Sequence, residues 1–143
     1  WNFFYFGYDI SSKAIKFAKK KSLKDSYFFT SKISTKIITA KLDNWKIKKF
    51  DLAIYDRVLY LLSENEIKKH FENYKDYMSY LIIDDFHNSE TTEKNDAYFS
   101  KNYEIILLEF GFYLKKNEPS EHIFGNDEFF IRNARRLIFE KEE

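Results

Sequence analysis

The chain has 143 residues, a length that suits one domain with a hydrophobic core of its own. Charged residues make up 33% and apolar residues 44%, a globular composition that excludes an intrinsically disordered chain. The absence of cysteine excludes disulfides and thiolate metal sites, and it favours a cytoplasmic location. No apolar run reaches the roughly 20 residues that a helix needs to cross a bilayer.

The first part of the chain predicts a strand, a helix and a second strand. Phe3–Tyr8 is apolar on both faces, as strands of parallel sheets are. Ser11 or Ser12 can cap the helix that follows, because a serine hydroxyl accepts a hydrogen bond from an otherwise unpaired backbone N–H. Tyr27–Thr30 is the next predicted strand. Ser34–Trp45 fits both a helix and a strand, and we favour the helix.

The remaining segments continue the alternation of strand and helix. Ser63 and Glu66 have the spacing of a capping box, which predicts a helix start, and Gly111 can end a later helix in the left-handed conformation. No helix is predicted between the last two strands, so we expect them to be antiparallel. The strands are predicted at Phe50–Tyr55, Tyr80–Ile83, Phe112–Lys115 and Arg136–Glu140. This order indicates an α/β, Rossmann-like, mostly parallel sheet with an antiparallel C-terminal strand pair.

Five segments, in chain order, resemble parts of class I S-adenosylmethionine-dependent methyltransferases. Tyr8–Ala18 resembles the end of the family's second strand and the helix after it, with an acid where the two meet. Phe50–Leu62 resembles the fourth strand and its loop, and Tyr80–His87 resembles the fifth strand. Gly111–Leu114 and Arg135–Glu140 resemble the two closing strands. The resemblance covers nearly the whole chain.

The resemblance also implies that part of the domain is missing. In this family a glycine-rich loop follows the first strand and lets the backbone approach the methionine part of the cofactor. No segment matches that loop, and only Trp1 and Asn2 precede the strand at Phe3–Tyr8. We therefore expect residues 1–143 to form a partial methyltransferase domain, truncated at its start, whose absent first strand would lie between Phe3–Tyr8 and Phe50–Tyr55. Such a chain alone is expected to bind the cofactor poorly.

The cofactor that the resemblance implies is S-adenosylmethionine, held at the carboxyl ends of the strands. A carboxylate there can accept hydrogen bonds from both ribose hydroxyls, and this is the predicted role of Asp9. The alternative role for Asp9 is to cap the next helix. Ile10 would pack against the adenine ring. Ser31 stands where the family usually has an acid near the adenine amino group. Tyr55 ends the fourth strand, whose loop faces the methyl group in this family, and it is therefore predicted to contact the cofactor.

Three residues after the later strands are the catalytic candidates. Asp56 could orient the acceptor or act as general base, and Arg57 could pair with an anionic substrate, although the two could also form a structural surface pair. His87 could act as a base because its unperturbed pKa suits that role. Asp84 and Asp85 with His87 suggest a divalent metal, but the ligand set is incomplete and we predict no metal site.

The favoured function is methyl transfer to an unidentified acceptor, such as a small molecule, without a membrane partner. One alternative is an oxidoreductase that binds NAD or another nucleotide, because an acid at the second strand's end also suits an NAD ribose. Another is a noncatalytic domain that binds nucleic acid. Residues 13–49 contain 12 Lys and only two Asp, a local charge of +10 in a chain of net charge +1. We favour an ordinary solvated surface for this basic segment.

Overall fold

A computed structural model of the chain describes residues 5–9, 11–21, 26–30, 49–92, 98–121 and 127–142. The chain divides into two compact units, Trp1–Trp45 and Lys46–Glu143. The segment predicted as a helix at Ser34–Trp45 lies outside the described residues. Within the described ranges, no helix is long and apolar enough to cross a membrane.

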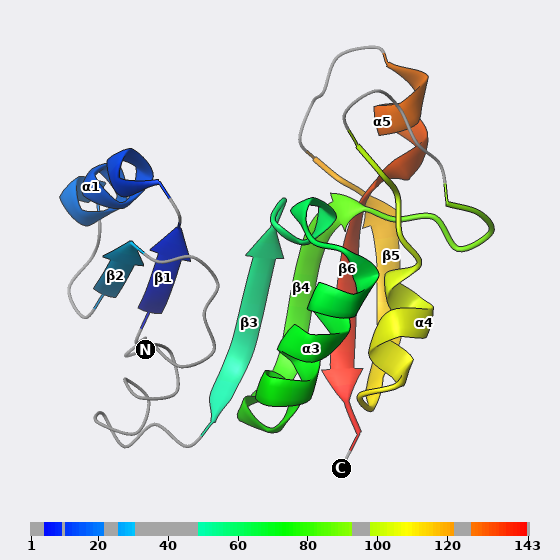
Figure 1. The fold of residues 1–143 in the computed structure, drawn as a ribbon, viewed down its shortest axis with the longest axis horizontal. Coiled ribbons are helices and arrows are strands. Elements are labelled where there is room, and N and C mark those ends of the chain that lie inside the picture. The colour runs from blue at the N-terminus through cyan, green and yellow to red at the C-terminus, as the bar shows by residue number, and fades with distance from the viewer. Residues whose placement is uncertain are drawn as a thin grey trace. The chain divides into compact units, whose positions relative to one another are not determined.

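The first unit contains a strand, a helix and a parallel strand, as predicted: β1 (Tyr5–Asp9), α1 (Ser12–Lys21) and β2 (Ser26–Thr30) (Figure 1). The two strands pair in register from Tyr5 opposite Ser26 to Asp9 opposite Thr30. Ile15 is the buried residue of α1, and the last turn carries three lysines. Positive charge there is favourable because the C-terminal end of a helix is partly negative.

The second unit carries a four-stranded sheet in the order β3-β4-β6-β5. β3 and β4 are parallel, and β6 is antiparallel to both β4 and β5, so the predicted antiparallel closing pair is confirmed. The expectation that no helix separates the last two strands is wrong, because a short helix, Glu128–Asn133, lies between them. This combination of helices with a mixed sheet is a Rossmann-like α/β fold. The elements of this unit are β3 (Phe50–Asp56), η1 (Leu59–Leu61), α3 (Glu64–Tyr74), η2 (Lys75–Tyr77), β4 (Met78–Phe86), α4 (Tyr103–Leu108), β5 (Phe112–Pro119), α5 (Glu128–Asn133) and β6 (Ala134–Lys141).

Local capping signals explain where the helices begin and end. The Ser63 hydroxyl accepts the Glu66 N–H at 3.3 Å and the Glu66 carboxylate accepts the Ser63 N–H at 2.8 Å, which confirms the predicted capping box at the start of α3. Asn102 caps α4 by accepting the Ile105 N–H. After α4, Gly111 has a φ of 81°, the left-handed conformation that was predicted.

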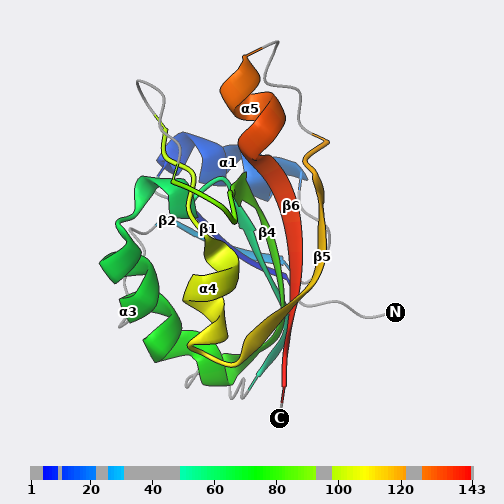
Figure 2. The same ribbon diagram turned by 90° about the vertical axis from the view of Figure 1, so that its right-hand side faces the viewer.

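The core lies on one face of the four-stranded sheet, under α3 and α4 (Figure 2). Leu81, Ile83, Leu137 and Phe139 are fully buried there, with Phe71 of α3 packed above the sheet. Because strand side chains alternate between faces, the neighbouring residues point the other way. Leu52, Ile54 and Tyr80 are accordingly 45%, 57% and 46% exposed, and within the described part of this unit no helix covers them.

Candidate functional site

The carboxyl ends of β3 and β4 lie side by side, because these strands are parallel and Asp56 is the register partner of Asp84. In open α/β sheets ligands bind at such an edge. The end of β3 carries Asp56, with Arg57 next in the chain, and the end of β4 is followed by His87. In the first unit, the carboxyl end of β1 carries Asp9. The predicted site residues therefore occupy equivalent strand ends, although their side chains have different surroundings.

Asp9 is the last residue of β1, as the sequence predicted. One carboxylate oxygen, Oδ1, accepts the Ser11 N–H at 2.7 Å, and the Ser11 hydroxyl accepts the Ala14 N–H at 3.2 Å at the start of α1. Asp9 thus contributes to the turn that leads into the helix, while the hydroxyl of Ser11, one of the two predicted caps, accepts the helix N–H. Its side chain is exposed, and Oδ2 makes no hydrogen bond to the described residues. Ile10 and Ser31 lie outside the described residues.

Arg57 has a left-handed backbone at the end of β3. Its φ is 50°, and its N–H donates to the Asp84 carbonyl at 2.8 Å, which holds the turn against β4. Non-glycine residues rarely adopt this conformation, and strained residues of this kind cluster at ligand sites. The Arg57 Nε lies 3.8 Å from Asp56 Oδ1, and the Asp56 side chain is 60% exposed. The Asp56 carboxylate is therefore accessible at the sheet edge.

We expect Arg57→Gly to be more stable than Arg57→Ala by about 1 kcal/mol, because both variants lose the guanidinium but only alanine keeps the Cβ that opposes a left-handed backbone. The free energy of unfolding of each variant can be measured by urea denaturation. Equal stability, or a more stable alanine variant, would show that the backbone at this position is not strained.

Tyr55 is placed in the core, in contrast to the predicted cofactor contact. Its side chain is 6% exposed and its hydroxyl lies 2.8 Å from His70 Nε2 and 3.5 Å from the Met78 sulfur. The ring therefore points toward α3 and away from the open edge. Burial lowers the pKa of His70 to about 4, so this imidazole is neutral at pH 7. The placement favours a structural role for the Tyr55 side chain.

His87 is also buried, which argues against its predicted role as a base. It is 3% exposed, and its Nδ1 accepts the Tyr103 N–H at 3.3 Å, where it caps the start of α4. Burial lowers the pKa of His87 to about 4. At neutral pH the imidazole is therefore uncharged and fixed by the helix, and an acceptor could reach it only if the surrounding segments moved.

The two consecutive acids of β4 point to opposite faces of the sheet. Asp84 accepts hydrogen bonds from the Ser120 hydroxyl at 2.6 Å and from Arg136 Nε at 3.3 Å. Asp85 instead accepts the backbone N–H groups of Leu59 and Tyr60 at 3.0 and 3.1 Å. Within the described ranges, no three His, Cys, Asp or Glu side chains come close enough together to hold a metal ion.

A groove of about 580 Å³ lies in the second unit, between the start of α3 and the segment that leads into α4. Three apolar residues on its walls are well exposed: Leu61 (62%), Phe99 (45%) and Ile105 (61%). Tyr60 and Lys101 also line it. Sequence reasoning missed this groove because its two walls are about 40 residues apart in the chain.

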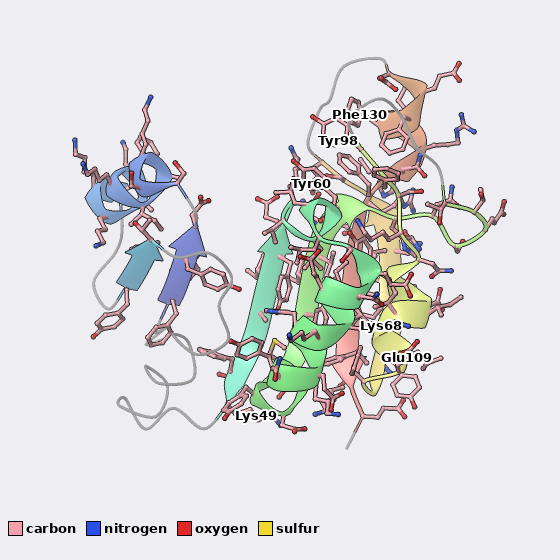
Figure 3. The ribbon with its side chains drawn as sticks, viewed as in Figure 1. Lys49, Tyr60, Lys68, Tyr98, Glu109 and Phe130 are labelled. Carbon is pink, nitrogen blue, oxygen red and sulfur yellow. The ribbon has the colours of Figure 1, made fainter. Side chains whose placement is uncertain are left out.

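An aromatic cluster adjoins the groove at the carboxyl end of β4. Figure 3 shows Tyr60, Tyr98 and Phe130 gathered there from three different segments. The Tyr60 ring lies 5.3 Å from both Phe86 and Tyr98 between ring centroids, and Phe130 lies 5.4 Å from Tyr98. These distances are typical of aromatic packing. The cluster joins α5 to the end of the sheet, and Phe129 of α5 also packs on Phe86.

No protein-family model matches the chain, and no curated protein matches it in sequence. Several solved structures share its fold. Magnesium protoporphyrin IX methyltransferase (ChlM) from Synechocystis, with bound S-adenosylhomocysteine, has a TM-score of 0.65 at 15% identity, over 97% of this chain and 64% of the other. A putative S-adenosylmethionine-dependent methyltransferase from Listeria monocytogenes has a TM-score of 0.64 at 14% identity, over 96% and 80%.

The fold alone does not identify the reaction. A structure described as a pericyclic reaction enzyme has a TM-score of 0.62 at 10% identity, over 99% of this chain and 37% of the other. The chain also spans only 60% and 64% of the two ChlM structures that it matches. At these identities the similarity establishes a Rossmann-like α/β fold of the methyltransferase type, and the function must be argued from the residues.

Proposed function

We propose that this chain is part of an S-adenosylmethionine-dependent methyltransferase that acts on an acceptor still to be identified. The observation that carries the proposal is the Asp9 carboxylate at the carboxyl end of β1, in a fold shared with structures that hold S-adenosylmethionine or S-adenosylhomocysteine. When bound, S-adenosylmethionine supplies an electrophilic methyl group for in-line transfer to an O, N or C nucleophile. The protein's part is to position the reactants and to accept a proton where the acceptor carries one.

The Asp9 side chain fits a ribose. Among the described residues Oδ1 alone accepts a hydrogen bond, from the Ser11 N–H, so Oδ2 can accept one from a ribose hydroxyl, and Oδ1 has a second lone pair. Hydrogen bonds to a carboxylate are roughly twice as strong as those between neutral groups. Ile10 is proposed to pack on the adenine and Ser31 to contact it, from their positions after the ends of β1 and β2.

On the acceptor side, Asp56 and Arg57 are the proposed contacts. Asp56 is exposed at the end of β3, so it can orient an acceptor or take its proton, while Arg57 can pair with an anionic group. We place the acceptor in the groove between the start of α3 and the segment that leads into α4. An apolar part of the acceptor would cover the exposed side chains of Leu61, Phe99 and Ile105, and the burial of this apolar surface would favour binding. The buried Tyr55 and His87 side chains are left out of this proposal.

Asp9→Asn tests the cofactor site. The asparagine Oδ1 still accepts the Ser11 N–H, so the turn before α1 is kept, but the charge that strengthens the ribose hydrogen bonds is lost. We expect the affinity of the protein for S-adenosylmethionine to fall by about 10-fold or more, a loss of roughly 1.5–3 kcal/mol, in isothermal titration calorimetry. Asp9→Ala, which removes both contacts, should also reduce the helix signal in circular dichroism.

The same titration separates the competing functions. NAD binding without S-adenosylmethionine binding would overturn the proposal in favour of an oxidoreductase. Salt-dependent binding of DNA or RNA without a response to S-adenosylmethionine would instead favour the noncatalytic alternative, since phosphate contacts release counterions. Unchanged affinity in Asp9→Asn would remove the role assigned to this carboxylate.

A further inference from the structure

We propose that Asp85 and Lys101 are positioning residues that clamp the backbone of Tyr60 from both sides and so hold one wall of the groove. The importance of that wall for an acceptor rests on the proposed function. The clamp itself can be tested independently of any methyl transfer. In this proposal both residues act through the backbone of Tyr60.

The clamp uses both polar groups of one residue. The Asp85 carboxylate accepts the Tyr60 N–H at 3.1 Å, and the Lys101 ammonium donates to the Tyr60 carbonyl at 3.0 Å. The same carboxylate oxygen, Oδ2, also accepts the Leu59 N–H at 3.0 Å. Asp85 belongs to β4 and Lys101 lies just before α4, so two distant segments hold the short η1 turn that follows β3.

This arrangement supplies what the local sequence does not. The residue before η1 is Val58, whose side chain cannot cap a helix, and no side-chain cap is formed there. The free N–H groups at the start of a helical turn need acceptors when they are buried. Asp85 provides the acceptor from another strand, 25 and 26 residues away in the chain. Without it, the fully buried Leu59 would carry an unsatisfied N–H.

Holding the Tyr60 backbone also places its ring. The ring packs on Phe86 and Tyr98 in the aromatic cluster, and both Tyr60 and Lys101 line the groove. Figure 3 shows Tyr60 between the end of the sheet and the other two labelled aromatic residues. A shift of the η1 turn would therefore change the groove wall and the cluster together.

The clamp depends on the charge of Asp85, which is 2% exposed. Burial raises the pKa of Asp85 to about 6, against the opposing effects of three backbone N–H groups and Lys101. Protonation weakens the hydrogen bonds that a carboxylate accepts. The titratable and charged groups on the elements packed around it are Tyr60, His87, Lys101, Tyr103 and Arg135. Of these, Lys101 has the direct electrostatic effect on the pKa of Asp85 that a variant can remove.

The test is a pH titration of the Leu59 and Tyr60 backbone amides in the intact chain, followed by ¹H–¹⁵N NMR from about pH 4.5 to about pH 8. We expect both chemical shifts to change with a common midpoint near 6, the value set by Asp85. In Asp85→Asn this titration should disappear. In Lys101→Met the midpoint should move to higher pH, because a neighbouring positive charge that favours the ionised carboxylate is gone.

Asp84→Asn is the matched control, since Asp84 is adjacent in sequence but bonds to Ser120 and Arg136 on the other face. This variant should leave the pH titration of the Leu59 and Tyr60 amide chemical shifts unchanged. A midpoint below about pH 5, or a midpoint unmoved in Lys101→Met, would overturn the clamp. Lys101→Met decides the matter even if Asp85→Asn fails to fold. Absence of S-adenosylmethionine binding would leave these titrations unaffected, so the two proposals can fail separately.

Discussion

Acidification from pH 7 to about pH 4 is expected to lower the free energy of unfolding, largely through His70 and His87. Burial lowers the pKa of each imidazole to about 4, whereas an unfolded histidine has a pKa of about 6.5. Between these values the unfolded state binds more protons than the folded state, so stability is lost as the pH falls through this window. A difference of about 2.5 pH units corresponds to roughly 3 kcal/mol for each histidine.

Asp85 acts in the opposite direction. Its pKa of about 6 in the folded state lies above the roughly 3.9 of an unfolded aspartate, so between about pH 4 and 6 the folded state binds the extra proton. The stability contributed by this group therefore rises on acidification, by up to roughly 3 kcal/mol. The three groups together should leave a net loss of about 3 kcal/mol by pH 4.

Two variants separate these contributions in urea denaturation at about pH 7 and about pH 4. His70→Gln removes one histidine, so its loss of stability on acidification should be smaller than that of the original chain by about 3 kcal/mol. Asp85→Asn removes the compensating group, so its loss should be larger by a similar amount. If the free energy of unfolding changed equally with pH in the original chain, His70→Gln and Asp85→Asn, these side chains would not have the pKa shifts that their burial causes.

Phe71→Ala is expected to destabilise the second unit by about 3–5 kcal/mol, the usual cost of removing a large aromatic side chain from a packed core. Phe71 is fully buried, and its ring lies 5.5 Å from Tyr55 and 6.1 Å from Phe112 between centroids. It thus joins α3 to β3 and β5. Its loss leaves a cavity that these rigid neighbours cannot fill.

The comparison variant is Ile131→Ala on α5, where the side chain is 66% exposed. Its change in stability should stay within about 0.5 kcal/mol, as is usual for exposed positions. Thermal and urea denaturation of both variants measure the contrast. A cost below about 1.5 kcal/mol for Phe71→Ala would mean that the ring is not part of a close-packed core.

Much of the fold could be predicted because its signals are local. The capping box at Ser63 and Glu66 needs only the spacing of two side chains, and Gly111 needs only its own backbone freedom. The alternation of strands and helices predicts parallel pairing, and the two late strands form the expected antiparallel pair even though α5 lies between them. The position of Asp9 at a strand end follows from the same pattern.

The surroundings of each site residue depend on contacts between distant segments. Tyr55 and Asp56 are neighbours in the chain, but strand alternation sends one side chain under α3 and leaves the other exposed. His87 is buried because α4 begins against it, and α5 was missed because its short helix is held by Phe129 on Phe86. Asp85 was considered only as a metal ligand, since its partners Leu59 and Tyr60 are brought to it by the pairing of β3 with β4. Periodicity reports which residues prefer burial, but the partner of a buried polar group is set by packing across the chain.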